Sequence, residues 1–237
     1  MRSRLILISF IVLVLLTGGF VWYRDRSPEQ PKVGGTIAIL LVGDSNALST
    51  TAALSSQAIS PEQVDPLFLV SDDDPFLGNP NAPFRIVEFL DFQCPFSRQA
   101  FPIMRRLTAR YPSEVFYQVR DFPVLSLHAD ALNLAKAGVC AHKQGRFWEL
   151  HDRVFLEQEK ASRPQIDVWA QKIGLDMNAF RSCFDSEETQ KEIVSDTEVG
   201  VAAGVRGTPT FFINGRRVEG PIPEKNFEAA IQALSQQ

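Results

Sequence analysis

The chain has 237 residues, of which 45% are hydrophobic and 22% are charged, and its formal net charge is −4. This length and composition suffice for one domain with a hydrophobic core of ordinary size, with residues left over for extensions. The isoelectric point near 5.5 and the lack of a local lysine and arginine cluster exclude a basic nucleic-acid-binding surface. We therefore expect no nucleic acid partner.

The first predicted element is a membrane segment. Arg2 and Arg4 precede an uncharged run over residues 5–23, and Arg24 follows it. The run is roughly long enough to cross a bilayer, and it ends in bulky aromatic residues rather than in the small residues of a cleavage site. We expect residues 1–26 to be an uncleaved anchor in the cytoplasmic membrane, with the rest of the chain on the extracytoplasmic side. The alternative is a cleaved signal peptide and a secreted or periplasmic protein.

A flexible linker is predicted over residues 27–71. This stretch is rich in Ser, Ala, Gln, Pro and Gly and follows neither a helical nor a strand period. Its apolar residues 37–42 either form a strand that pairs with the domain or make an apolar patch in the linker. Turn residues at 72–83 then mark the start of a folded domain over residues 72–237.

A strand and a helix open the predicted domain, and a cysteine lies at their junction. Residues 85–90 are apolar and β-branched, as is typical of a buried strand. Cys94 follows, and a proline at the first turn favours a helix over residues 95–111. Pro102 is expected to kink this helix. Residues 115–119 predict a second central strand.

A long helical region separates the second strand from a C-terminal hairpin. Residues 210–213 have strand character, and Asn214-Gly215 predicts a two-residue hairpin turn. A last helix is marked by the apolar stripe of Phe227, Ile231 and Leu234. The order of elements predicts an α/β domain with a central sheet flanked by helices. The helices of the long region are expected at residues 129–143, 147–155, 164–173, 177–183 and 192–203.

Two segments resemble one known family. Residues 87–97 contain Cys-Pro-Phe-Ser, and residues 207–215 read Gly-Thr-Pro-Thr-Phe-Phe-Ile-Asn-Gly. Together they resemble the DsbA-like branch of the thioredoxin superfamily, and the likeness covers about residues 72–234. The resemblance implies a thioredoxin fold with an inserted helical subdomain at about 124–190, and thiol–disulfide exchange as the activity. The family's site is Cys-X-X-Cys, and this chain has Ser97 at the second cysteine position.

Cys94 is the predicted nucleophile. A cysteine at the first turn of a helix lies near unpaired N–H groups and the positive end of the helix dipole, which favour the attacking thiolate. The alternative is a buried, unreactive thiol. Ser97, one turn further, could donate its hydroxyl to the sulfur but could not form a disulfide. A second substrate thiol or an external thiol must then release Cys94 from a mixed disulfide, which gives isomerisation or reduction.

Glu88, Thr208 and Pro209 are the other predicted site residues. Glu88 lies on the predicted buried strand, where the resembled family carries an acidic residue beneath its active site. A buried carboxyl would have a raised pKa and could exchange protons with the sulfur, whereas a carboxyl at the sheet edge would only face solvent. By resemblance, Pro209 is a cis-proline beside the sulfur, and Thr208 offers its backbone to an extended substrate. An ordinary trans bond is the alternative.

The remaining cysteines, Cys140 and Cys183, fall in the predicted helical insertion. We favour a structural disulfide between them, because an oxidising compartment preserves it and the closed loop contributes roughly 4 kcal/mol. The alternative is that one of them replaces the missing partner of Cys94. The spacing of the three histidines with the cysteines matches no zinc template, so no metal is expected.

The predicted function is that of an extracytoplasmic monothiol oxidoreductase acting on disulfides of exported proteins, without a cofactor. An external thiol or a membrane redox partner would regenerate it. The alternative from another class is a catalytically silent thioredoxin-fold module that binds peptides or acts as a chaperone. A weaker alternative is that Cys-Pro-Phe-Ser is similar to the Cys-Gly-Phe-Ser site of monothiol glutaredoxins. That resemblance implies an iron–sulfur cluster, which an oxidising exterior disfavours.

Overall fold

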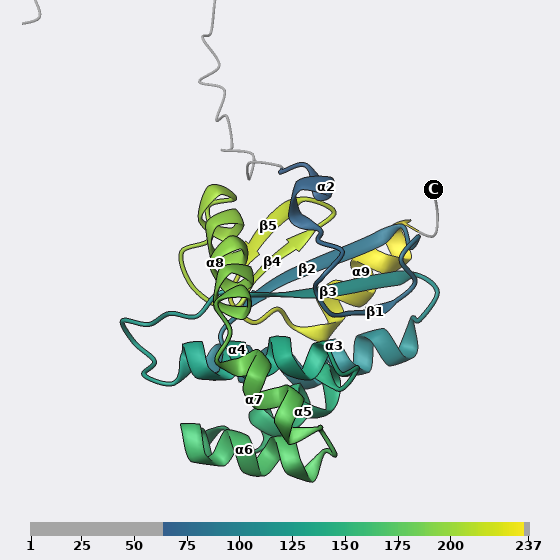
Figure 1. Ribbon diagram of the computed structural model, residues 1–237. Helices are drawn as coiled ribbons and strands as arrows, with labels where there is room; N and C mark the ends of the chain where they lie inside the picture. The colour runs from purple at the N-terminus through teal and green to yellow at the C-terminus, as the bar shows by residue number, and fades with distance from the viewer. Residues whose placement is uncertain (1–63, 235–237) are drawn as a thin grey trace, which may run out of the picture. The chain divides into compact units, whose positions relative to one another are not determined.

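A five-stranded sheet forms the centre of the computed structural model, which describes residues 64–234 (Figure 1). The strand order is β1-β3-β2-β4-β5, in which β2 and β3 are parallel and the other neighbours are antiparallel. The sheet therefore brings β2, which leads to Cys94, beside β4, which follows Pro209. The strands are β1 Phe76–Gly78, β2 Phe84–Leu90, β3 Val115–Asp121, β4 Thr210–Ile213 and β5 Arg216–Glu219.

Helices cover both faces of the sheet, which explains why β2 is apolar along most of its length. Side chains alternate along the strand, so Ile86 and Leu90 pack on one face and Val87 and Phe89 on the other. Helices α3 (Pro95–Arg110) and α9 (Glu224–Leu234) contribute to the apolar cluster on the first face. The residues after α8 (Glu187–Ala202) and the short α2 (Pro66–Leu69) contribute to the cluster on the second (Figure 1).

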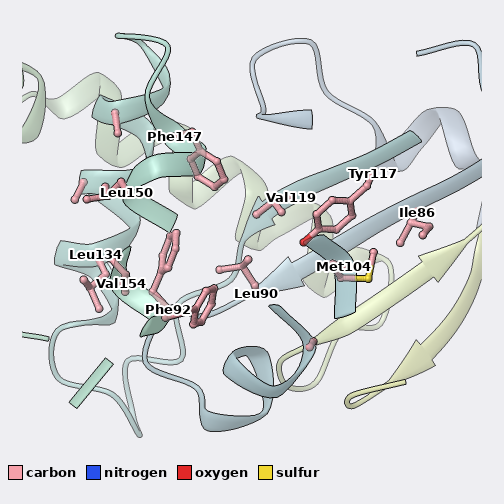
Figure 2. Packing of buried hydrophobic residues seen from close by; sticks show 14 of the residues in the cluster. Ile86, Leu90, Phe92, Met104, Tyr117, Val119, Leu134, Phe147, Leu150 and Val154 are labelled. Atoms are coloured by element: carbon pink, nitrogen blue, oxygen red, sulfur yellow. The ribbon is translucent and has the colours of Figure 1, made fainter. Parts of the chain in front are cut away.

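The predicted helical insertion is present between β3 and α8. Its core is continuous with that of the sheet: Phe92, which follows β2, packs on Phe147 with ring centroids 6.2 Å apart. Figure 2 shows Phe92 between Leu90 of the sheet and the insertion residues Phe147 and Leu150. The insertion is therefore fixed beside the residues that lead to Cys94. Its helices are α4 Ala131–His142, α5 Phe147–Leu156, η1 Gln158–Lys160, α6 Arg163–Lys172 and α7 Met177–Phe184.

A disulfide joins α4 to α7 within the insertion. Cys140 and Cys183 are bonded, with their Cα atoms 5.8 Å apart, and Cys140 is fully buried. The predicted structural pairing is confirmed. Neither of these cysteines is then a free thiol that could resolve a mixed disulfide on Cys94, which is the free cysteine of the described chain.

The folded domain begins before the predicted boundary at Asp72. The N–H of Val64 donates to the carbonyl of Gly215 (3.0 Å), and Leu69 of α2 is buried in the apolar cluster on the α8 face. A four-residue helix is too short to show a period in the sequence, so the sequence pattern places residues 64–71 in the linker. The strand β1 was not predicted for the same reason, because it has only three residues.

Helix α8 begins five residues earlier than the predicted start at residue 192. Ser186 is its N-cap, and the Ser186 hydroxyl accepts a hydrogen bond from the N–H of Thr189 (3.2 Å). The first turn of α8 is acidic and polar, so its apolar period becomes visible only further along. The cap, rather than the period, determines where the helix begins.

Within residues 64–234, no helix is both long enough and apolar enough to cross a membrane. The predicted anchor at residues 5–23, most of the predicted linker and its apolar stretch at 37–42 lie outside the described residues.

Candidate active site

Cys94 is the N-cap of α3, at the end of the short turn that follows β2, and is 5% exposed. The first intrahelical hydrogen bond runs from the N–H of Arg98 to the carbonyl of Cys94 (3.1 Å). The N–H groups of Phe96 and Ser97 precede it and have no acceptor within the helix. With Pro95 in the first turn and no acidic side chain there, this end of α3 favours a negative charge at the sulfur.

The thiol of Cys94 faces a backbone loop from the other end of the chain. Its Sγ donates to the carbonyl of Thr208 (3.1 Å), and the bond between Thr208 and Pro209 is cis, as the resemblance implied. Pro209 is buried and leads directly into β4. Because the thiol supplies the hydrogen of this bond, deprotonation of Cys94 leaves the Thr208 carbonyl free to accept a hydrogen bond from another donor.

Ser97 lies one turn into α3 and is 1% exposed. Its Oγ has no hydrogen-bond partner, and neither has the buried Oγ1 of Thr208. A buried hydroxyl without a partner costs about 1–3 kcal/mol, so this position suits a side chain that needs no hydrogen bond, such as a cysteine. Donation from Ser97 to the sulfur is not seen in this structure and stays a prediction.

Glu88 is buried, at 2% exposed, which decides between the two alternatives left open by the sequence. It shares the face of Ile86 and Leu90, the face that α3 covers. The hydroxyl of Tyr117 donates to Glu88 Oε2 (2.6 Å). Burial raises the pKa of Glu88 to about 8, against the smaller opposing effect of the Tyr117 hydrogen bond. The carboxyl is therefore mostly protonated at neutral pH, and it can gain or lose a proton at pH values close to neutral.

Asp91 holds the turn between β2 and Cys94, a role that was not predicted from the sequence. Its Oδ1 accepts a hydrogen bond from the N–H of Gln93 (2.7 Å). Its Oδ2 accepts from the N–H of Val124 (2.7 Å) and lies 2.8 Å from Nδ1 of His128. The carboxylate thereby fastens the cysteine turn to the loop that follows β3. The feature of the sequence that could have indicated this role is the position of Asp91 directly after a predicted buried strand.

Gln158, in η1 of the insertion, holds the same turn from the other side. Its Nε2 donates to the carbonyl of Phe92 (2.8 Å) and to the carbonyl of Cys94 (3.1 Å). Nothing in the local sequence of Gln158 indicates this contact, because it lies more than sixty residues beyond the turn that it binds. The insertion therefore supports the turn that bears Cys94 directly.

A cavity of about 210 Å³ adjoins Thr208 and Pro209. A larger cavity of about 370 Å³ lies along α8, but the described residues that line it, Glu187, Gln190, Lys191 and Val194, include no thiol. The smaller cavity is the relevant one, because one of its walls is the residue that binds the Cys94 thiol. No group of metal-ligating side chains is found among residues 64–234.

A cysteine at a helix N terminus that faces a cis-proline loop, on a helix-covered sheet with a helical insertion, defines a thioredoxin-fold protein with a one-cysteine site. Residues 70–233 match the family model Thioredoxin_4, described as thioredoxin. The chain belongs to this family.

Curated relatives include a Na(+)/H(+) antiporter, NhaA 3, of Salinispora tropica. The two chains are 35% identical over 162 residues, which make up 68% of this chain and 25% of the antiporter. A second relative, NhaA 1 of Mycolicibacterium gilvum, is 30% identical over 211 residues, or 86% of this chain and 34% of the antiporter. The chain thus spans about a quarter to a third of the length of these relatives.

Solved structures support the DsbA-like form of the fold. The thiol-disulfide exchange protein α-DsbA2 of Wolbachia pipientis superposes with a TM-score of 0.65 at 20% identity, covering 70% of this chain and 90% of that one. A thioredoxin-like oxidoreductase of Silicibacter pomeroyi gives 0.60 at 23% identity, covering 70% and 95%. The catalytic domain of Proteus mirabilis ScsC gives 0.63 at 19%, covering 72% and 94%. The expected fold with its helical insertion is confirmed.

Proposed function

We propose that the protein is a monothiol thiol–disulfide oxidoreductase of the isomerase or reductase type, with Cys94 as its nucleophile. The observation that carries the proposal is the placement of the Cys94 thiol at the N terminus of α3, 3.1 Å from the carbonyl of Thr208 beside cis-Pro209. At this point the N terminus of α3 can stabilise a thiolate, and the carbonyl of Thr208 can accept a hydrogen bond from an extended substrate. The structural neighbours, a thioredoxin-like oxidoreductase and a thiol-disulfide exchange protein, support the same class of reaction.

The proposed cycle has two displacements. The Cys94 thiolate attacks one sulfur of a substrate disulfide, so a mixed disulfide forms and the other substrate sulfur leaves as a thiolate that takes up a proton. A second thiolate, from the substrate or from a small thiol, then attacks the mixed disulfide and releases Cys94. When the second thiolate comes from the substrate, the substrate is isomerised. When it comes from a small thiol, the substrate is reduced. Ser97 cannot close an internal disulfide, so the site does not store oxidising equivalents.

The proposed substrates are cysteine-containing proteins exported across the cytoplasmic membrane. The support is the Cys140–Cys183 disulfide, since such bonds persist in oxidising compartments, together with the predicted anchor at residues 5–23. A small external thiol or a membrane redox partner is the proposed regenerating species. Ion transport, named for the antiporter relatives, is not proposed, because the match covers only about a quarter to a third of those proteins.

The test is the reactivation of a disulfide-scrambled model protein in a glutathione buffer. The full chain is expected to accelerate reactivation, and Cys94→Ala to abolish the acceleration. Ser113→Ala, at an exposed position in the turn before β3, is the matched control and should leave the rate unchanged. Equal rates with the intact chain and Cys94→Ala would remove the enzymatic proposal.

A catalytically silent peptide-binding module is the second proposed function. It is favoured by the exposed apolar side chains around the cysteine turn: Phe96 is 53% exposed, and Leu127, in the loop held by Asp91, is 76% exposed. Binding of an unfolded peptide to Cys94→Ala with unchanged affinity, combined with no reactivation activity in the intact chain, would select this function over catalysis.

A further inference from the structure

The cavity at the Thr208–Pro209 loop is open, and its lining includes both apolar and polar surface. It extends from Thr208, whose carbonyl accepts the thiol hydrogen bond, to Arg206, Glu219 and Gly220. A Cβ added at Gly207 would meet no atom within 4 Å, so no side chain closes the cavity over this residue. Its volume of about 210 Å³ is below that of sites that enclose a whole drug-sized ligand. The cavity is therefore suited to one end of a ligand whose other end reaches the sulfur.

Arg206 supplies an uncompensated positive charge to this cavity. Its side chain is exposed and forms no ion pair or hydrogen bond with any residue in 64–234. The acidic side chain in the same lining, Glu219, is 55% exposed and lies 3.7 Å from the guanidinium of Arg217, which partly offsets its charge. Arg206 is therefore available to an incoming anion.

The other charged groups near the cysteine turn have partners or are buried. Arg98, on the first turn of α3, is paired with Glu159. Asp91 is fully buried and binds His128. Glu88 is buried with a raised pKa and is mostly neutral at pH 7. Among the charged side chains that line the cavity in the described part of the chain, Arg206 is the one without an ion pair.

We propose that Arg206 and this cavity bind a carboxylate that lies close to the cysteine sulfur of the thiol or disulfide with which Cys94 exchanges. This inference rests on the proposed function and names a chemical preference of the same site. Two sources carry the chemistry: a small acidic thiol of the glutathione class, and a cysteine peptide with a flanking aspartate or glutamate. Both place a carboxylate one or two residues from sulfur.

The exchange step is balanced with a small acidic thiol R′SH. The Cys94 thiolate attacks the R′ sulfur of a disulfide R–S–S–R′, so a Cys94–S–S–R′ bond forms and RS⁻ leaves and is protonated. A second R′S⁻ attacks the R′ sulfur of this mixed disulfide, which forms R′–S–S–R′ and returns Cys94 as a thiolate. The disulfide R–S–S–R′ is reduced and R′SH is oxidised, with Arg206 holding the R′ carboxylate in both steps.

The test uses mass spectrometry to measure the rate at which the full-length protein forms a mixed disulfide on Cys94. The probes are glutathione disulfide, which is anionic, cystamine, which is cationic, and hydroxyethyl disulfide, which is neutral. Arg206→Gln is expected to lower the glutathione rate and raise the cystamine rate, so that their ratio falls about threefold to tenfold in dilute buffer. The neutral rate should stay unchanged, and salt should reduce the intact protein's preference.

Arg216→Gln is the matched control, because Arg216 is also exposed but lies in β5 outside the cavity lining. A second arm uses disulfide-linked peptides with Asp or Asn beside the cysteine. An effect of Arg206→Gln on the charged small disulfides, on the Asp peptide, or on both supports the inference and identifies the source. Unchanged ratios in both arms overturn it. Failure of the neutral probe to react with Cys94 would instead overturn the proposed function.

Discussion

At the scale of single residues, two neighbours of Cys94 act on its proton in opposite directions. The free N–H groups at the start of α3 favour the thiolate, whereas the Thr208 carbonyl, 3.1 Å from Sγ, favours the thiol because it accepts the thiol hydrogen. A substrate strand that donates a backbone N–H to this carbonyl would displace the thiol from it. Binding of substrate and activation of the nucleophile would then use the same acceptor.

Ser97→Cys should restore a two-cysteine site. The buried Ser97 hydroxyl has no partner, so a thiol can replace it without loss of a hydrogen bond. After mild oxidation, the variant should contain a disulfide between Cys94 and the thiol introduced at position 97, and it should oxidise a dithiol peptide stoichiometrically. Titration of free thiols in the denatured protein checks this: the intact chain should keep one, since its other two cysteines are paired.

Ser113→Cys is the control for that titration, because it adds an exposed thiol beyond the C-terminal end of α3, at the opposite end of the helix from Cys94. It should add one reactive thiol and no oxidase activity. Two free thiols in Ser97→Cys after oxidation would mean that the α3 geometry does not allow the bond.

Glu88→Gln should change the pH dependence of stability. The folded-state pKa of Glu88, about 8, exceeds its ordinary value of 4.5, so the folded protein binds more protons between these values. Stability therefore falls as pH rises through this window, by up to about 1.4 kcal/mol per pH unit for this group. Glu88→Gln keeps an acceptor for Tyr117 and removes the ionisation. Urea unfolding at pH 5 to 8 should show a shallower decline for the variant, and parallel curves would contradict this.

At the scale of elements, a buried charged cluster joins the segment before β1 (residues 69–74) to β3 and α8. The guanidinium of Arg120 lies 3.1 Å from Asp74 and binds Asp196 with its Nε at 2.9 Å. It also donates to the carbonyl of Leu69 (3.1 Å). Burial, and then the charge of Asp196, raise the pKa of Asp74 to about 9. Asp74 is therefore protonated at neutral pH, and Arg120 offsets Asp196.

Substitutions in this cluster should have unequal effects. Asp74→Asn preserves the neutral state of Asp74 at pH 7 and should cost less than about 1 kcal/mol. Arg120→Met leaves the carboxylate of Asp196 buried without its partner and should cost about 3–5 kcal/mol. Urea unfolding at pH 7 compares the two variants. Equal losses would show that Asp74 is ionised in the folded protein.

At the scale of the whole molecule, the insertion and the sheet form one support for the cysteine turn. The Phe92–Phe147 contact and the hydrogen bonds from Gln158 connect the insertion to this turn, and the Cys140–Cys183 bond connects two helices of the insertion. Loss of order in the insertion should thus also disturb the turn that bears Cys94. We therefore expect the placement of Cys94 to depend on the stability of the insertion.

Replacement of both Cys140 and Cys183 by alanine should lower the free energy of unfolding by about 2–4 kcal/mol, because the bond closes a loop with a sequence separation of 43. At 25 °C, where the variant is expected to remain folded, alkylation of Cys94 should keep its rate. The measurements are urea unfolding and iodoacetamide kinetics. Unchanged stability would indicate that the bond does not constrain the unfolded chain.

Several elements could be predicted because their signals are local. The β2–α3 junction combines an apolar run, Cys94 and Pro95, and the β4–β5 hairpin has Asn214-Gly215, whose φ angles of 47° and 80° suit its turn. Helix α2 and strand β1 could not be predicted, because three or four residues show no period. Burial of Glu88 could not be decided, since it depends on α3 covering one face of the sheet.

The sequence by itself determined the order of the longer strands and helices and placed Cys94 at a strand–helix junction, because residue type and short-range spacing encode them. The resemblance to the Cys-X-X-Cys family added the proposed role of Cys94 and the serine at the second cysteine position. Only the tertiary structure decided the burial of Glu88, the bracing of the cysteine turn by Asp91 and Gln158, and the unpaired Arg206 beside the Thr208 loop. These features depend on contacts between segments far apart in the chain. Their energies come from burial and from partners that no local pattern specifies.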